Sequence, residues 1–212
     1  HVLRFIAGYD VSVNGTSRTD AGVHALGQCA SFNWDNPLPT NKLANIMNRR
    51  FGAGGLGRSG LPGDIRVISA VEVPSDFHAR FSCHGKTYKY VVDRSGDIFE
   101  RNYVYQYGYE LDHEAMRVAA KAAVGTHDFA SFQTTGGIPR ETTVRTVTDI
   151  AISDEGERTI IRVTGDGFLY NMVRIIVGTL LEIGTGKRSV SDMEQIVADA
   201  TRSSAGFGAD IF

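Results

Sequence analysis

The sequence predicts an α+β fold, in which helices pack on a mainly antiparallel sheet. Segments of strand composition follow one another directly several times, without the intervening helices that a doubly wound parallel sheet requires. A second observation is the segment 168–184, whose apolar residues cover nearly the whole circumference of a helix. Such a helix is buried, so the strands must supply a surface for it to pack on.

Five strands and one helix are expected in the first part of the chain, up to residue 92. The strands span residues 2–9, 11–13, 25–34 and 64–73, to which the alternating run KTYKYVV at 86–92 is added. Thr40 is expected to cap the helix, because Leu43, Ile46 and Met47 follow it at helical spacing. A glycine-rich loop then runs to Gly63.

The rest of the chain alternates between strand pairs and helices. Strands are expected at 103–107, 142–153 and 158–165. Asp112 is expected to cap a helix that Gly125 ends. Ser191 and Glu194, three residues apart, predict a capping box for the last helix.

Composition excludes some classes of protein. The 212 residues carry 22 Lys plus Arg against 24 Asp plus Glu, which argues against a protein that coats nucleic acid but allows a local basic groove. No run of eighteen apolar residues and no signal-peptide pattern occurs, so we expect a cytoplasmic protein. Cys29 and Cys83 lie far apart, which indicates neither a disulfide framework nor a cysteine zinc site.

Arg174 stands out because it lies within the most apolar helix of the chain. An unpaired guanidinium away from water is costly, so Arg174 needs an anionic partner. Glu182 lies eight residues on, about 12 Å along a helix axis, which is too far for a direct pair. The alternatives are a structural ion pair and a site in a cleft, and the helix alone does not decide between them.

A second unusual stretch is SRTDAGVHALGQ at residues 17–28. Asp20 followed by Ala-Gly is adequate for an ordinary Asx turn, which is the commoner use of such a sequence. An Asx turn does not require the arginine and threonine that precede Asp20, nor the histidine that follows. These residues suggest a further function for the loop.

Several blocks together resemble the tRNA pseudouridine synthase A family, over a range from the first block to about Gly206. The blocks are RTDAGVHALGQ at 18–28, LPGDI at 61–65, DFHARFS at 76–82, KTYKY at 86–90, GTHDFASF at 125–132 and GFLYNMVRIIVGTLLEIG at 167–184. Any one block would be weak, whereas their joint occurrence in order is specific. The resemblance implies an enzyme that isomerises uridine to pseudouridine in the anticodon stem-loop of tRNA.

The family also implies roles for individual residues. Asp20 would be the catalytic carboxylate, Arg174 its partner, and Tyr88 the aromatic residue against the target base. The residues expected to contact RNA are Arg18, His24, Arg80 and Lys86. No cofactor and no metal is expected, because the reaction oxidises nothing and loses no atom. Whether Asp20 attacks the sugar as a nucleophile or acts as a base stays open.

The same resemblance implies tRNA as the partner and a homodimer as the assembly. We expect two ferredoxin-like subdomains that share the sheet, residues 1–80 with the Asp20 loop and residues 81–212 with the Tyr88 strand and the Arg174 helix. The chain departs from the family at Ser17, usually Gly, and at Tyr9-Asp10, which runs directly into VSVNGTS. We expect that residues present in the family are absent from this sequence after Asp10. The ending GADIF also departs from the family, which continues into a proline-containing stretch after Phe207.

Two other functions compete with this interpretation. Gly52–Gly57 matches G-x-G-x-x-G, which would suggest a dinucleotide-binding oxidoreductase, but the motif follows a helix and precedes Pro62-Gly63. The second alternative is a non-catalytic RNA-binding module. Such a module would need the basic and aromatic residues but no pair between Arg174 and Asp20.

Overall fold

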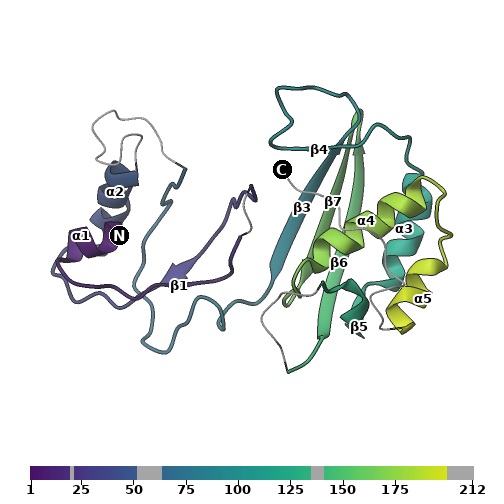
Figure 1. The fold of residues 1–212 in the computed structure, drawn as a ribbon. Coiled ribbons are helices and arrows are strands. Elements are labelled where there is room, and N and C mark those ends of the chain that lie inside the picture. The colour runs from purple at the N-terminus through teal and green to yellow at the C-terminus, as the bar shows by residue number, and fades with distance from the viewer. Residues whose placement is uncertain (20–21, 52–63, 135–140, 200–212) are drawn as a thin grey trace. The chain divides into compact units, whose positions relative to one another are not determined.

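The computed structural model describes residues 1–19, 22–51, 64–134 and 141–199 (Figure 1). The chain divides into two compact units. The N-terminal unit comprises His1–Arg18 and Ala25–Cys83, and the C-terminal unit comprises Thr19–His24 and His84–Phe212. The short segment Thr19–His24 therefore groups with the later part of the chain, although both of its flanks belong to the N-terminal unit.

The N-terminal unit begins with helix α1 (Val2–Ala7), where a strand was predicted. Leu3 is buried and Ile6, three residues on, is half-buried, so the apolar residues share one helical face. Gly8 ends the helix in the left-handed conformation, φ 82°, and its N–H donates to the carbonyl of Arg4. The strand prediction was wrong because a short apolar run fits a helix as well as a strand.

The remaining strand predictions for this unit are mostly wrong. Strand β1 (Asn14–Gly15) pairs antiparallel with β2 (Ala30–Ser31), and residues 11–13 and 64–73 form no strand. Helix α2 (Thr40–Phe51) is confirmed, with Leu43 buried. The Asn48 side chain donates to the carbonyl of Val67 and accepts its N–H, at 2.8 and 2.7 Å. A side chain thus supplies the hydrogen bonds that a neighbouring strand was expected to provide.

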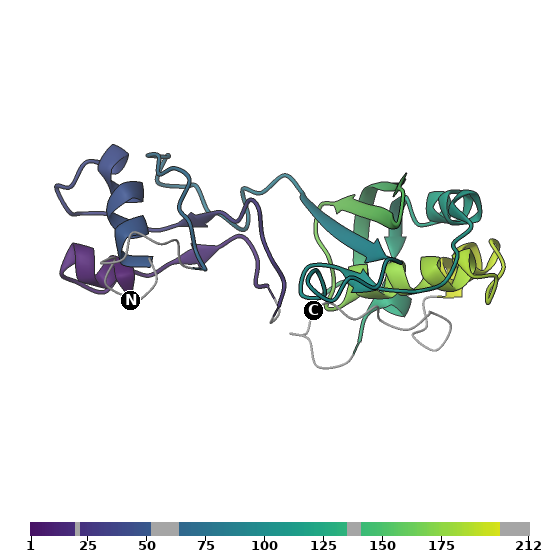
Figure 2. The ribbon, with the colours of Figure 1, turned by 90° about the horizontal axis from the view of Figure 1, so that it is seen from above.

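The C-terminal unit contains a five-stranded sheet in the order β4-β3-β7-β6-β5 (Figures 1 and 2). Its strands are β3 (Lys86–Asp93), β4 (Tyr105–Gln106), β5 (Gly125–Asp128), β6 (Val144–Glu155) and β7 (Arg158–Gly165). All pairs are antiparallel except β3 with β4. The strands predicted at 86–92, 142–153 and 158–165 are confirmed, and the strand predicted at 103–107 shortens to two residues.

Three helices cover one face of this sheet (Figure 1). They are α3 (His113–Ala122), α4 (Met172–Gly184) and α5 (Asp192–Asp199), and a short 3-10 helix, η1 (Ala130–Phe132), lies between β5 and β6. The Asp112 carboxylate accepts the N–H of Ala115, which confirms the predicted cap. Helix α3 ends at Ala122 rather than at Gly125, which begins β5.

The side-chain bonds at the start of α5 (Asp192–Asp199) join Ser189 and Asp192 in place of the predicted pair Ser191 and Glu194. The Asp192 carboxylate accepts both the N–H and the hydroxyl of Ser189. Ser189 and Asp192 have the same spacing of three residues as Ser191 and Glu194, so the sequence allowed either pair.

The main core lies between the sheet and the helices. Alternation puts Tyr90 and Val92 of β3 on the helix side, where they pair with Ile161 and Thr159 of β7, and all four are buried. Helix α4 is buried over almost its whole length, as its composition predicted. The α+β class is thus confirmed.

The expected sharing of one sheet by two subdomains is not found among the described residues. Each described sheet is formed within a single unit. The two strands in the described part of the N-terminal unit are each two residues long. The subdomain boundaries of 1–80 and 81–212, and their ferredoxin-like character, stay predictions. Within the described ranges, no helix is long and apolar enough to cross a membrane.

Candidate active site

Asp20 lies outside the described residues, and the structure describes its neighbours Thr19 and Gly22. Gly22 has φ 79°, a left-handed conformation that glycine adopts without strain. The turn that the sequence DAG predicted therefore needs this glycine. Thr19 and Gly22 belong to the C-terminal unit, as do Tyr88 and Arg174.

Tyr88 is the third residue of β3 and lies on the helix-facing side of the sheet, opposite Val163 of β7. Its side chain is half-buried at the margin of the core. The ring meets that of Phe168 edge to face, with centroids 5.3 Å apart and planes at 89°. This geometry fixes the orientation of Tyr88 on one side and keeps part of its ring accessible.

Arg174 lies in the first turn of α4 and is half-buried, while Val173 and Ile175 beside it are buried. Glu182 accepts a short charged hydrogen bond from the Nε of Arg188. Glu182, which the helical spacing puts too far along α4 for a direct pair with Arg174, thus has a cationic partner in Arg188. Arg174 stands at the amino-terminal end of α4, where the helix dipole adds to its positive charge and favours an anion.

The residue that precedes α4, Asn171, has an unusual backbone conformation with φ 60°. It is the one non-glycine residue with positive φ in the described ranges. Its side-chain amide donates to the hydroxyl of Thr134 at 2.8 Å. No local sequence pattern indicates this bond between Asn171 and Thr134. This bond fixes the start of the helix that carries Arg174.

Tyr88 and Arg174 lie at the same end of the C-terminal unit, where β3 begins and β7 ends. Only residues 166–171 connect β7 to α4, and Phe168 in this connection contacts Tyr88. Gly165 permits the close packing at this end. A Cβ there would lie 2.7 Å from the carbonyl oxygen of Thr146 and 3.2 Å from the ring of Phe168.

The four residues predicted to contact RNA differ in environment. Arg18 and Arg80 are exposed in the N-terminal unit. Lys86 is half-buried at the start of β3, two residues before Tyr88 and on the same face. His24 is exposed in the C-terminal unit, and its ring lies against that of Tyr103, with centroids 5.1 Å apart.

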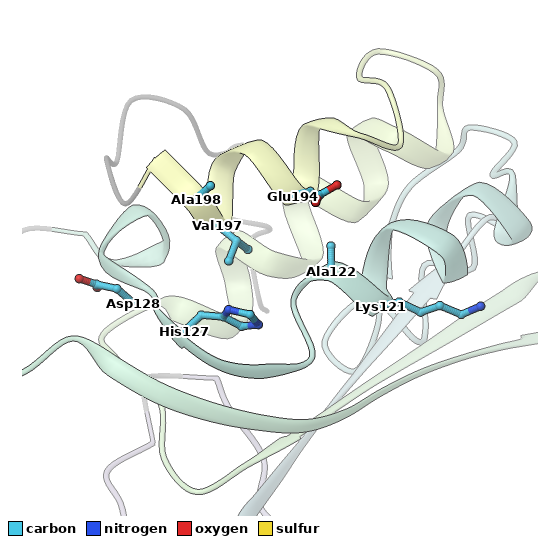
Figure 3. A pocket seen from close by; sticks show the side chains of 7 residues that line it. All are labelled: Lys121, Ala122, His127, Asp128, Glu194, Val197 and Ala198. Carbon is cyan, nitrogen blue, oxygen red and sulfur yellow. The ribbon is translucent and has the colours of Figure 1, made fainter.

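A surface hollow of about 560 Å³ lies elsewhere on the C-terminal unit (Figure 3). It is lined by Lys121, Ala122, His127, Asp128, Glu194, Val197 and Ala198. None of these is a predicted site residue. The Asp128 carboxylate accepts hydrogen bonds from Ala130 and Thr143, which is a structural role. The hollow marks a gap between α3, α5 and β5 and adds nothing to the site at Tyr88.

Asp93, at the far end of β3 from Lys86, has a structural role. Burial raises the pKa of its carboxyl, but hydrogen bonds from Ser95 and Arg158 and the charge of Arg158 outweigh this and hold the pKa below the ordinary value of 3.8. The Nε of Arg158 lies 3.1 Å from Oδ1 of Asp93. A perturbed carboxyl in this unit therefore need not belong to an active site.

The described residues present an arginine at a helix amino terminus, a half-buried tyrosine and a lysine at one end of a sheet. In the part of the chain that the structure describes, no cluster of three or more His, Cys, Asp or Glu side chains could hold a metal ion. The arrangement can bind and orient an anion beside an aromatic ring. A carboxylate placed there would be kept ionised by the guanidinium.

Comparison with known proteins bears on this arrangement. The profile of a family described as tRNA pseudouridine synthase matches residues 119–210. The chain is similar to tRNA pseudouridine synthase A of Halalkalibacterium halodurans, with 46% identity over 201 residues that cover 94% of this chain and 72% of the relative. It is also similar to tRNA pseudouridine synthase A of Clostridium acetobutylicum, with 43% identity covering 97% of this chain and 80% of the relative.

Proposed function

The chain belongs to the tRNA pseudouridine synthase A family, and from this we propose that it isomerises uridine to pseudouridine in the anticodon stem-loop of tRNA, with Asp20 as the catalytic carboxylate. The observation that carries the role of Asp20 is the position of Arg174. This guanidinium interrupts an otherwise buried helix at the end of the sheet where Tyr88 lies. Thr19 and Gly22, the described residues on either side of Asp20 in the sequence, belong to this same unit.

The chemistry requires a carboxylate that stays ionised. The bond from the sugar C1′ to N1 of uracil breaks, and a bond from C1′ to C5 forms. C5 loses a proton and N1 gains one, so the atoms balance without an oxidant or a leaving group. Arg174 and the positive end of the α4 dipole favour the charged form of Asp20. Ionised Asp20 then either attacks C1′ or removes a proton from the sugar.

The target base must leave the helical stack to reach Asp20. Tyr88 offers an aromatic surface of the kind on which a detached base packs. Because Phe168 meets its ring edge to face, the orientation of Tyr88 is set before RNA arrives. Lys86, on the same face of β3, is positioned to contact a phosphate of the target strand.

Arg18 and Arg80 of the N-terminal unit complete the proposed RNA contacts. Both are exposed and cationic, as contacts to phosphates require. We also propose that the protein acts as a homodimer on one tRNA, which rests on family membership alone. His24 was also predicted to contact RNA, and its ring lies against that of Tyr103.

The test is pseudouridine formation in tRNA by the wild type and by Asp20→Asn. Asp35→Asn is the matched control, because Asp35 is exposed and lies outside every family block. We expect full activity from Asp35→Asn and a rate roughly 10,000-fold lower, but still measurable in single turnovers, from Asp20→Asn, while both bind tRNA. Mapping the product then tests whether the modified uridines lie in the anticodon stem-loop.

Two outcomes would overturn the proposal. Equal product from Asp20→Asn and the wild type removes Asp20 as the catalyst. Binding of tRNA without product in the wild type would favour the non-catalytic RNA-binding module. The dinucleotide-binding alternative depends on Gly52–Gly57, which lies outside the described residues, and saturable binding of a nicotinamide cofactor would support it.

A further inference from the structure

The ring of His24 lies against that of Tyr103, a residue that has no part in the proposed reaction. The ring centroids are 5.1 Å apart and the planes are inclined by 31°. Both residues belong to the C-terminal unit, and His24 follows Asp20 by four positions. The contact therefore attaches the end of the Asp20 segment to the body of this unit.

Tyr103 is 63% exposed, so its ring is not packed in the hydrophobic core. Its backbone is nevertheless held in place. Its N–H donates to the carbonyl of Glu100 at 2.8 Å, and the next residue, Val104, is buried. The carboxylate of Glu100 pairs with Arg158 of β7 at 3.7 Å. An exposed aromatic ring on a fixed backbone can act as a support for another segment.

Further hydrogen bonds stabilise the loop between β3 and β4. The N–H of Asp97 donates to Oγ of Ser95, and the N–H of Phe99 donates to Oδ1 of Asp97. The side-chain amide of Gln106 donates to the carbonyl of Asp97 at 2.7 Å. The loop is therefore built to hold one conformation, although much of it is exposed.

We propose that His24 is a positioning residue, whose ring packs on Tyr103 and holds the Asp20 segment in register with Tyr88 and Arg174. This inference rests on the proposed catalytic role of Asp20. Arg18 and Ala25 belong to the N-terminal unit, whereas His24 groups with the C-terminal unit, in which its ring contacts Tyr103. A loss of this attachment misplaces the carboxylate, and small misplacements can slow a reaction about 100-fold.

The test compares single-turnover pseudouridine formation with tRNA affinity for Tyr103→Ala, Tyr103→Phe and His24→Ala. We expect Tyr103→Ala and His24→Ala to slow the reaction roughly 10- to 100-fold with little change in tRNA Kd. Tyr103→Phe keeps the ring and should retain the wild-type rate. The double variant should be no slower than the slower single variant, because both changes remove the same contact.

Phe99→Ala is the matched control. Phe99 lies in the same loop and is 86% exposed, but it has no ring contact with His24. It should react at the wild-type rate. Because Tyr103 and His24 are exposed, we expect thermal unfolding of all variants to match the wild type. A variant that unfolds is replaced by His24→Phe, which keeps an aromatic ring and should retain activity.

The competing possibility is that His24 contacts RNA. In that case His24→Ala weakens tRNA binding, Tyr103→Ala leaves the rate unchanged, and the positioning role is overturned. A wild-type rate in both alanine variants overturns it as well. If Asp20 is not the catalyst, Asp20→Asn stays active, whatever the rates of the Tyr103 variants. The two failures can therefore be told apart.

Discussion

The two units of the chain differ in how much apolar surface they bury. In the described part of the N-terminal unit, the buried apolar residues are Leu3, Leu43 and Ala79. The main core, by contrast, lies entirely in the C-terminal unit, between its five-stranded sheet and helices α3, α4 and α5. Tyr88 and Arg174 are placed on this well-packed unit. Of the predicted catalytic residues, the two that the structure describes thus lie in the unit whose packing can fix their geometry.

The largest expected effect concerns a charge on the well-packed unit. Arg174→Met should slow single-turnover pseudouridine formation roughly 100- to 1000-fold, because a charge-stabilising group is lost. The free energy of unfolding should change by about 1 kcal/mol or less, because Met keeps the apolar part of the side chain. Release of tritium from tRNA labelled at uridine C5 gives the rate, and urea unfolding gives the stability.

Arg162→Met is the matched control for Arg174→Met. Arg162 is also a half-buried arginine of the C-terminal unit, but strand alternation puts it on the face of β7 opposite to Tyr88. We expect its rate to match the wild type. An equal loss of rate in Arg162→Met and Arg174→Met would show that the reaction depends on the overall positive charge and not on the position of Arg174.

A second prediction compares the cores directly. Leu180 of α4 and Leu43 of α2 are both buried, one in each unit. Leu180→Ala should lower the free energy of unfolding of the C-terminal unit by about 2–5 kcal/mol. Leu43→Ala should weaken hydrogen-exchange protection in α2 and leave protection in α4 unchanged. Equal loss of protection in α4 from both variants would show that the units unfold as one.

A third prediction concerns the close packing beside Tyr88. Gly165→Ala should destabilise the C-terminal unit by about 1–3 kcal/mol, because a Cβ would lie 2.7 Å from the carbonyl of Thr146. It should also slow pseudouridine formation, since Phe168 must move relative to Tyr88. Gly108→Ala is the control, because a Cβ there meets nothing within 4 Å. Similar unfolding curves for the two variants would argue against this packing.

The smallest expected effect is a pH dependence at Asp93. The folded state lowers the pKa of this carboxyl, so its contribution to stability is complete above the ordinary value of 3.8 and is lost as pH falls through the lower folded pKa. The free energy of unfolding, measured in urea, should therefore fall more steeply with decreasing pH for the wild type than for Asp93→Asn. Parallel curves for the two proteins would contradict the lowered pKa.

The sequence predicted the C-terminal unit better than the N-terminal unit, for a physical reason. The strands at 86–92 and 158–165 have clear strand composition, and the helix of Arg174 is apolar around nearly its whole circumference, because each packs against a large core. At 2–9 the apolar run is short and belongs to a unit with little core, so helix and strand fit it equally well. The strand predicted at 64–73 does not form. The side chain of Asn48 takes both backbone hydrogen bonds of Val67, which a neighbouring strand would otherwise make.

The candidate site could be predicted only in part. Arg174 is recognisable as a charge in an apolar helix, and Tyr88 comes from the family resemblance. The contacts of Tyr88 with Phe168 and of Asn171 with Thr134 join residues far apart in the chain, so no local pattern indicates them. The contact of His24 with Tyr103 also joins residues far apart in the chain, so the sequence does not indicate it.

The most direct test of the central claim, that Asp20 and Arg174 act as one catalytic pair, is a double-mutant cycle. The single-turnover rate of tritium release is measured for Asp20→Asn, Arg174→Met and the double variant on the same tRNA. Residues that act as a unit give strongly non-additive losses. The account predicts that the double variant is no slower than the slower single variant. Losses that multiply, or a wild-type rate in Asp20→Asn, would contradict it.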